Sequence, residues 1–99
     1  MSERRSGNEM AGIGISFRAQ VNKQLLIVAS MKDDGPAARS GKVRVGDLLE
    51  TIDGVEVKTT DFEELAHLLL GPEGSTVRLG LRRDGKLINA PIVREILLR

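Results

Sequence analysis

Two glycines near the start of the chain alternate with β-branched residues, in the run Gly12-Ile13-Gly14-Ile15-Ser16-Phe17. Because Gly12 and Gly14 lack a Cβ atom, the backbone here can turn several consecutive N–H groups toward one point. Such a concave nest suits an anion, and a carboxylate is the anion at the end of every polypeptide. If residues 16–19 continue as an open strand edge, a peptide whose carboxylate lies in the nest can pair its backbone alongside.

Other kinds of chemistry find little support in the residue pattern. His67 is the only histidine and falls between the apolar positions of a predicted helix, so we expect it on the surface, and no nucleophile motif supports a Ser-His-Asp triad. Asp33, Asp34 and Asp53 lie in predicted turns and lack the ligand spacing of a calcium site. A dinucleotide-binding fingerprint is disfavoured because Phe17 stands where its third glycine should be and no helix follows. We therefore expect no catalytic residue, no metal site and no cofactor.

Composition narrows the class of protein. The 99 residues fit one domain, and 40% hydrophobic with 29% charged residues is typical of a soluble globular protein. Absence of cysteine excludes disulfides and thiol chemistry within the chain. A net charge of +1 and only two aromatic residues, Phe17 and Phe62, argue against nucleic acid as a partner. The polar start of the chain does not resemble a signal peptide, and no apolar stretch approaches the ~18 residues of a membrane span.

Apolar runs separated by turn residues predict about six strands, one short helix and one longer helix. Pro36 suits the first position of a short helix that Gly41 ends, and Asp53-Gly54 is a strong hairpin signal. Thr60 or Asp61 can cap the longer helix, which ends at Gly71-Pro72. The predicted strands are 12–19, 24–31, 48–52, 55–57, 76–83 and 86–93, with a turn at 83–86, and the predicted helices are 36–40 and 62–70.

In their order and spacing, these motifs resemble a PDZ domain, and the resemblance covers Gly12 to about Val93. It implies an α+β, mainly β fold, a partly open six-stranded β-barrel or sandwich with two helices. The expected organisation is a flexible N-terminal segment 1–10, a PDZ domain over 11–95 and a tail over 96–99. The motifs are Gly12-Ile13-Gly14-Ile15, Gly35-Pro36-Ala37-Ala38 with Gly41, Val45-Gly46-Asp47-Leu48-Leu49, Ile52-Asp53-Gly54 and Thr76-Val77-Arg78-Leu79.

A closer resemblance is to the PDZ domains of C-terminal processing, or tail-specific, peptidases. Animal PDZ domains begin with an apolar strand before the glycine loop, whereas residues 1–10 here are too polar for a core strand. The C-terminal strand Lys86 to Val93 would fill that place, as in the circularly permuted domains of these peptidases. The segments Gly71 to Ser75 and Arg82 to Lys86 also resemble the corresponding segments of that subfamily. The chain has no room for a serine/lysine catalytic domain, so we expect no enzymatic activity in it. The resemblance suggests the periplasm, the plastid lumen or the cytoplasm as its compartment.

The resemblance also implies site residues. Backbone N–H groups of Ile13, Gly14 and Ile15 would hold the ligand carboxylate. Phe62 stands where many animal domains have a histidine that bonds a ligand Ser or Thr, so a tail with hydrophobic last and third-from-last residues is expected. Arg4, Arg5 or Arg18 could assist the carboxylate. The groove residues implied on the strand and the helix are Ser16, Phe17, Arg18, Phe62, Leu65, Ala66 and Leu69.

We therefore expect a module that recognises hydrophobic C-terminal tails by strand addition, as the substrate-recognition or regulatory domain of a processing peptidase. One alternative is a scaffold or assembly module in a non-proteolytic protein. Another is a structural domain whose groove is self-occupied. In that case the apolar tail 96–99 would enter a neighbour's groove and cause weak, concentration-dependent self-association.

Overall fold

The computed structural model describes residues 11–20, 25–57 and 62–96. The predicted N-terminal segment 1–10, residues 21–23 of the polar stretch 20–23 between the first two predicted strands, the helix cap at Thr60 or Asp61 and the tail residues 97–99 lie outside the described residues. The elements, in chain order, are β1 (Ile15–Gln20), β2 (Leu25–Met31), α1 (Pro36–Ser40), β3 (Leu48–Ile52), β4 (Val55–Glu56), α2 (Phe62–Leu69), β5 (Thr76–Arg83) and β6 (Lys86–Val93).

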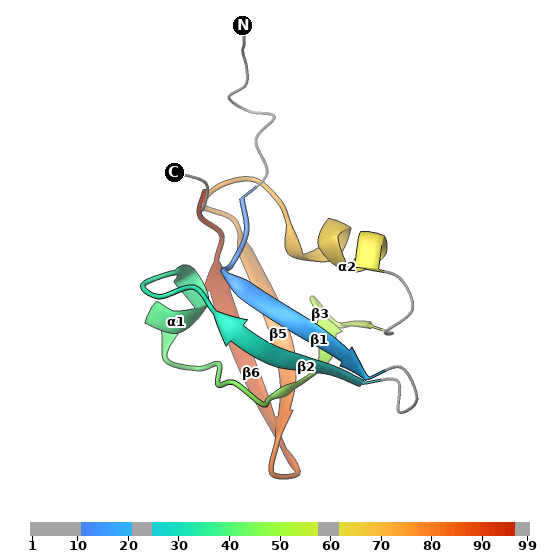
Figure 1. Ribbon diagram of the computed structural model, residues 1–99. Coiled ribbons are helices and arrows are strands. Elements are labelled where there is room, and N and C mark those ends of the chain that lie inside the picture. The colour runs from blue at the N-terminus through green and yellow to red at the C-terminus, as the bar shows by residue number, and fades with distance from the viewer. Residues whose placement is uncertain (1–10, 21–24, 58–61, 97–99) are drawn as a thin grey trace, which may run out of the picture.

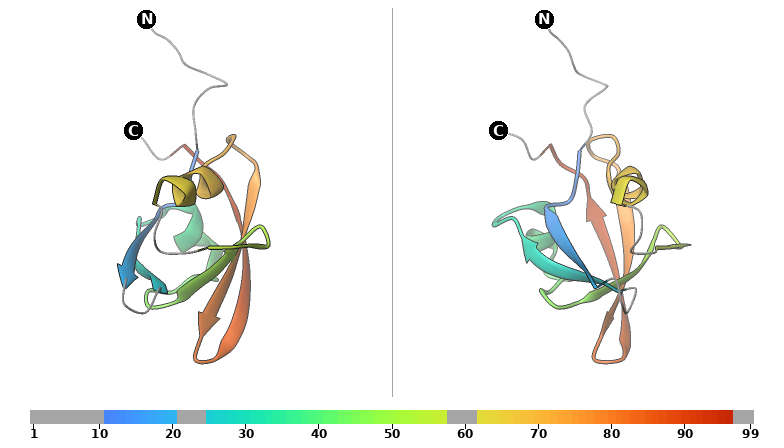
Figure 2. Two further views of the ribbon diagram at one scale, coloured as in Figure 1. Left: turned by 90° about the vertical axis from the view of Figure 1, so that its right-hand side faces the viewer. Right: turned by 45° about the vertical axis from the view of Figure 1, so that its right-hand side comes forward.

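The strands form one antiparallel six-stranded sheet in the order β1-β2-β3-β5-β6, with β4 paired to β3 (Figure 1). Two isolated bridges, Ala11 with Gly71 and Gly12 with Glu95, join the segment before β1 to the segments that precede β5 and follow β6. The sheet therefore curls into a partly open barrel, which the turned views of Figure 2 show. This mainly β fold with two helices confirms the predicted fold class.

Turn residues end several elements where the sequence predicts, but the first strand is Ile15–Gln20 and not 12–19, because residues 11 and 12 instead pair with Gly71 and Glu95. Pro36 begins α1, and Gly41 closes it in the left-handed conformation at φ 71°, with its N–H bonded to the Ala38 carbonyl at 3.3 Å. The β3–β4 and β5–β6 turns have positive φ at two consecutive residues, 51° and 80° at Asp53-Gly54 and 52° and 79° at Asp84-Gly85. Such turns match the right-handed twist of the strands they connect, which explains why Asp-Gly marks both hairpins.

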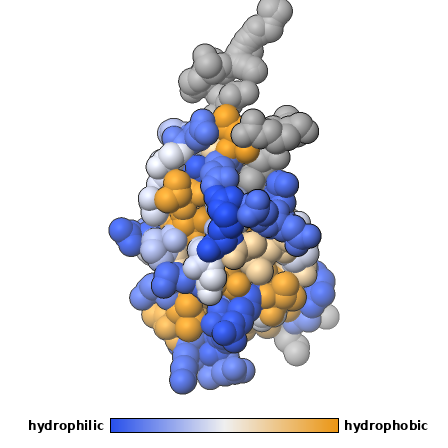
Figure 3. Space-filling model, turned by 90° about the vertical axis from the view of Figure 1, so that its left-hand side faces the viewer, coloured by the Kyte–Doolittle hydropathy of each residue, from blue (hydrophilic) through white to orange (hydrophobic). Residues whose placement is uncertain are grey.

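The core lies inside the curled sheet, and the alternation between buried and exposed residues is clearest on β5 and β6. On β5, for example, Val77, Leu79 and Leu81 are fully buried while Arg78 is exposed. Figure 3 shows the side that carries α1, where apolar surface occurs in patches separated by hydrophilic side chains. No helix in the described ranges is long and apolar enough to cross a membrane. The buried core residues are Ile13, Leu26, Val28, Ala37, Val43, Leu49, Ile52, Leu65, Val77, Leu79, Leu81, Ala90 and Ile92.

A partly buried ion pair joins the loop before β3 to the end of β5. The Asp47 side chain is 2% exposed, and its Oδ1 and Oδ2 accept bonds from Nε and Nη2 of Arg83, both at 2.8 Å. The Arg44 backbone N–H also donates to Oδ2 at 2.9 Å. Chiefly through the hydrogen bonds from Arg83, the pKa of Asp47 lies below its ordinary value. The sequence placed Asp47 only in a turn and did not reveal this partner, 36 residues away.

Candidate functional site

The segment before β1 is held from two sides. Ala11 exchanges backbone hydrogen bonds with Gly71 at 2.8 and 3.1 Å. Gly12, the next residue, exchanges two with Glu95, both at 2.9 Å. The start of the glycine loop is therefore held between the segment that follows α2 and the segment that follows β6.

Within the loop, the carbonyl groups of Ile13 and Gly14 accept hydrogen bonds from other parts of the fold. The Ile13 carbonyl accepts a bond from the Ala37 N–H at 3.0 Å, and the Gly14 carbonyl accepts one from Lys32 at 2.9 Å. The N–H groups of Ile13 and Gly14 donate to no other residue in the described part of the chain. Gly14 has a φ of 76°, whereas Ile13 and Ile15 lack positive φ, and such an alternation directs neighbouring N–H groups to one side. The local geometry suits an anion.

The structure gives a different reason for the glycine at position 14. A Cβ atom built on Gly14 would lie 3.3 Å from the Lys32 Cβ and 3.6 Å from the Pro36 Cδ, so it would point toward the start of α1. Glycine is required here mainly by the left-handed backbone, which other residues adopt at a cost of about 1–3 kcal/mol. A substitution at Gly14 would therefore strain the loop as well as alter a carboxylate site.

Strand β1 has an unpaired edge beside this loop. It pairs with β2 alone in the described part of the sheet, in a register from Ile15 opposite Met31 to Gln20 opposite Leu25, with an irregularity between Ser16 and Phe17. Phe17 is partly buried against the core, whereas Ser16 and Arg18 are exposed. Backbone N–H and carbonyl groups on such an edge can pair with an extended peptide.

Helix α2 lies on the side of the free edge of β1, as the right-hand view of Figure 2 shows. Leu65 is 6% exposed and anchors the helix in the core, and Leu69 is partly buried against that core. Phe62 is 53% exposed, and Ala66 is also exposed. The four residues of the predicted helix face thus divide into two that pack inward and two that remain available to a ligand. His67 is exposed, as predicted.

Arg94 positions the end of α2, although it belongs to none of the sequence motifs described above. Its side chain is buried, and Nε and Nη2 donate to the carbonyls of Leu69 and Leu68 at 2.8 and 3.2 Å. Its Nη1 donates to the Ser75 Oγ at 2.8 Å. The guanidinium fills the space beside Gly71, where a Cβ would lie 2.8 Å from the Arg94 Cζ. The available signal in the sequence was a cation directly after the apolar residues Ile92 and Val93 at the end of β6.

Charged side chains around the loop are partly paired with one another. Arg39 of α1 forms an ion pair with Glu95 and donates a hydrogen bond to the Asp34 carbonyl. Arg18 is exposed on β1, and Arg4 and Arg5 lie outside the described residues. Within the described ranges, no group of His, Asp or Glu side chains could hold a metal ion.

Comparison with known proteins identifies the family. A family model described as a PDZ domain matches residues 27–83. The chain belongs to the PDZ domain family. This PDZ domain is 35% identical, over 91 residues and 90% of its length, to the carboxy-terminal-processing protease of Bartonella bacilliformis. It is 40% identical, over 70 residues and 71% of its length, to the chloroplastic carboxyl-terminal-processing peptidase 2 of Arabidopsis thaliana. The chain spans 20% and 13% of the lengths of these two relatives.

Solved structures give the same result. The PDZ domain of the carboxy-terminal protease from Vibrio cholerae, determined in complex with a peptide, superimposes with a TM-score of 0.75 at 28% identity. That alignment covers 88% of this PDZ domain and 96% of the other chain. The photosystem II D1 C-terminal processing protease matches with a TM-score of 0.81 over 93% of this chain and 25% of its own, and its 24% identity shows the shared fold alone.

These findings confirm the family and the relationship to processing peptidases. The strand Lys86–Val93 is β6, an end strand of the sheet whose exit segment pairs with the start of the glycine loop. This position is what a circularly permuted order requires, but the permutation itself stays a prediction. The assignment of individual residues to carboxylate binding and to the groove also stays a prediction.

Proposed function

We propose that this PDZ domain binds the C-terminal ends of polypeptides whose last residue is hydrophobic, and that it recognises or regulates substrates for a C-terminal processing peptidase. The observation that carries the proposal is the edge of β1 that no described strand pairs, which leads directly to the N–H groups of Ile13 and Gly14, neither of which donates to another described residue. A tail added to that edge would end at those donors. The PDZ domain from Vibrio cholerae, which was solved with a peptide, supports a peptide as the ligand.

The carboxylate would contribute much of the affinity. Hydrogen bonds to a charged group contribute about 1.5–3 kcal/mol each, more than bonds between neutral groups. Two such bonds, from Ile13 and Gly14, correspond to about 3 kcal/mol, or about a hundredfold in affinity. A free C-terminus would therefore be required, and an internal segment of the same sequence would bind far more weakly.

Side-chain selectivity would come from the residues beside the added strand. Ile15 and Phe17 of β1 are partly buried against the core, and Leu69 of α2 is partly buried against it as well. Phe62 offers an exposed aromatic ring at the start of α2 and no hydrogen-bonding group. This apolar lining favours tails that are hydrophobic at both the last and the third-from-last positions.

The enzymatic context is part of the same proposal. The processing peptidases to which the domain is related are about five to eight times as long as the aligned segment. Catalysis would occur in another part of such a protein, while this domain would deliver or license the substrate tail.

A titration with matched peptides tests the proposal. Short peptides with hydrophobic last and third-from-last residues are prepared as free acids and as C-terminal amides, and binding is followed by fluorescence anisotropy. We expect amidation to weaken binding about a hundredfold. Equal binding of acid and amide would contradict the carboxylate site, and no binding of either would contradict the peptide-binding function of the isolated domain.

A further inference from the structure

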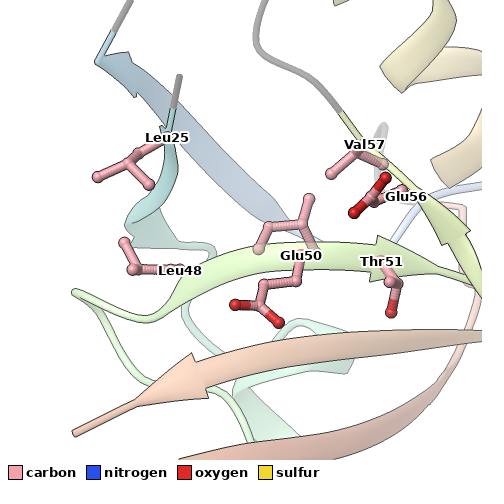
Figure 4. Close-up of a pocket in the computed structure, with 7 residues that line it drawn as sticks. Leu25, Leu48, Glu50, Thr51, Glu56 and Val57 are labelled. Atoms are coloured by element: carbon pink, nitrogen blue, oxygen red, sulfur yellow. The ribbon is translucent and has the colours of Figure 1, made fainter. Parts of the chain in front are cut away.

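A hollow opens where β2 and β4 separate above β3. Both strands pair with β3, β2 through Ile27 opposite Leu48 and β4 through Glu56 opposite Thr51. Between these points the sheet leaves a recess with a volume of about 370 Å³. Figure 4 shows Leu25 and Val57 on opposite sides of the recess, with β3 as its floor and the blue ribbon of β1 running behind it.

The recess lies where a tail bound to β1 would leave the strand. Antiparallel addition with the carboxylate at Ile13 and Gly14 directs the upstream residues of the tail toward Gln20. The six residues of β1 cover about 20 Å at about 3.3 Å per residue, so the sixth or seventh tail residue from the end reaches the end of the strand. Gln20 is opposite Leu25, which lines the recess.

The lining of the recess combines apolar surface with negative charge. Leu25, Leu48, Leu49 and Val57 supply the apolar part, and Glu50 and Glu56 are the acidic members.

The two carboxylates differ in their partners. Both Glu50 oxygens accept bonds from Arg82, at 3.0 and 3.1 Å, so that charge is compensated. Glu56 is exposed, and its side chain has no ion-pair or hydrogen-bond partner among the described residues.

We infer that recognition of a bound tail extends past β1 into this recess, which takes a lysine or arginine six or seven residues before the tail's end. The aliphatic stem of such a residue would lie on Leu25 and Val57 while its cationic head approaches Glu56. The inference rests on the proposed function, because the site of the carboxylate fixes the direction and register of the tail. It adds a specificity-determining residue, Glu56, outside the groove expected from the sequence.

Peptides of two lengths test the inference. The test peptides are eight-residue free acids that share the same hydrophobic C-terminal residues. One series carries Lys, Ala or Glu at the sixth position from the C-terminus, and a second series carries them at the seventh. A four-residue free acid and its amide provide the reference. Because an exposed charge pair contributes modestly, we expect Lys to bind about two- to fivefold more tightly than Ala, and Glu more weakly than Ala. The preference for Lys should decrease as salt is raised.

Three variants and one control variant test whether the preference for lysine depends on the recess. Glu56→Gln should remove the discrimination between Lys and Glu peptides, and Glu56→Lys should reverse it. Asp84→Asn is the matched control, because it removes one negative charge at the exposed β5–β6 turn, where asparagine tolerates the φ of 52°. Leu25→Ala should reduce the advantage of the eight-residue Lys peptide over the four-residue peptide and leave four-residue binding unchanged.

The outcomes separate the inference from the proposed function. If the four-residue acid binds, its amide does not, and the Lys, Ala and Glu peptides bind equally, the inference fails and the proposed function stands. A Lys preference that persists in Glu56→Gln also overturns the assignment to Glu56. If the four-residue acid and amide bind equally, the proposed function fails and the inference fails with it.

Discussion

Replacing Arg94 by lysine is expected to loosen the C-terminal end of α2. The guanidinium holds two carbonyls of the last helical turn, those of Leu68 and Leu69, and the Ser75 hydroxyl, through three different nitrogen atoms. A cation at this end also interacts favourably with the helix dipole. Lysine would keep the charge but has one nitrogen, so it cannot reproduce the three directions of the guanidinium.

The magnitude follows from the bonds that are lost. If the ammonium keeps one of the three bonds, two charge-assisted bonds are lost at about 1.5 kcal/mol each, which corresponds to about 3 kcal/mol of unfolding free energy. For a domain of this size, each kcal/mol shifts Tm by about 4–8 °C, so we expect Tm to fall by about 15 °C. Peptide affinity should fall as well, because α2 would form one side of the proposed groove.

Urea denaturation followed by circular dichroism measures the loss, with the transition midpoint expected to shift at an unchanged slope. Arg78→Lys is the matched control, because Arg78 is exposed on β5 and its side chain has no partner among the described residues. We expect the control to change stability by less than about 0.5 kcal/mol. A loss below about 1 kcal/mol in Arg94→Lys would refute the conclusion that these bonds hold the helix end.

Three further predictions concern single sites. Asp47→Asn should destabilise the domain by about 2 kcal/mol, because it removes the charge from the partly buried pair with Arg83. Because folding lowers the Asp47 pKa, the stabilisation by this carboxylate is fully present above its unfolded pKa of about 4. It disappears as the pH falls through the lower pKa of the folded state. When the free energy of unfolding is measured at decreasing pH, it should therefore fall less steeply in the variant than in the unmodified domain. Gly80→Ala should cost about 1–3 kcal/mol because its Cβ would lie 2.2 Å from the Thr51 Oγ1, and adding Thr51→Ala should restore most of that loss in a double-mutant cycle. Phe62→His should shift peptide-array selectivity toward Ser or Thr at the third-from-last position with little change in stability; an unchanged profile would contradict the position assigned to Phe62 beside the ligand.

The sequence by itself determined the elements and the family. The short helix, β3, β5 and β6 have the predicted bounds, because proline, glycine and Asp-Gly pairs act on the backbone of their immediate neighbours. Helix α2 ends at Leu69, one residue before the predicted end. The glycine loop was visible for the same reason, since its conformation depends on which residues lack a Cβ atom.

Only the tertiary structure decided which distant residues meet. Arg94 contacts carbonyls about 25 residues earlier in the chain, and Asp47 contacts Arg83 across 36 residues. The free edge of β1 and the recess between β2 and β4 depend on the strand order and register of the whole sheet. Local patterns carry no information about such pairings, because the register follows from the simultaneous packing of every strand on one core. The sequence therefore predicted the loop and the helix of the candidate site, whereas their fixed positions and the acidic recess follow from the fold.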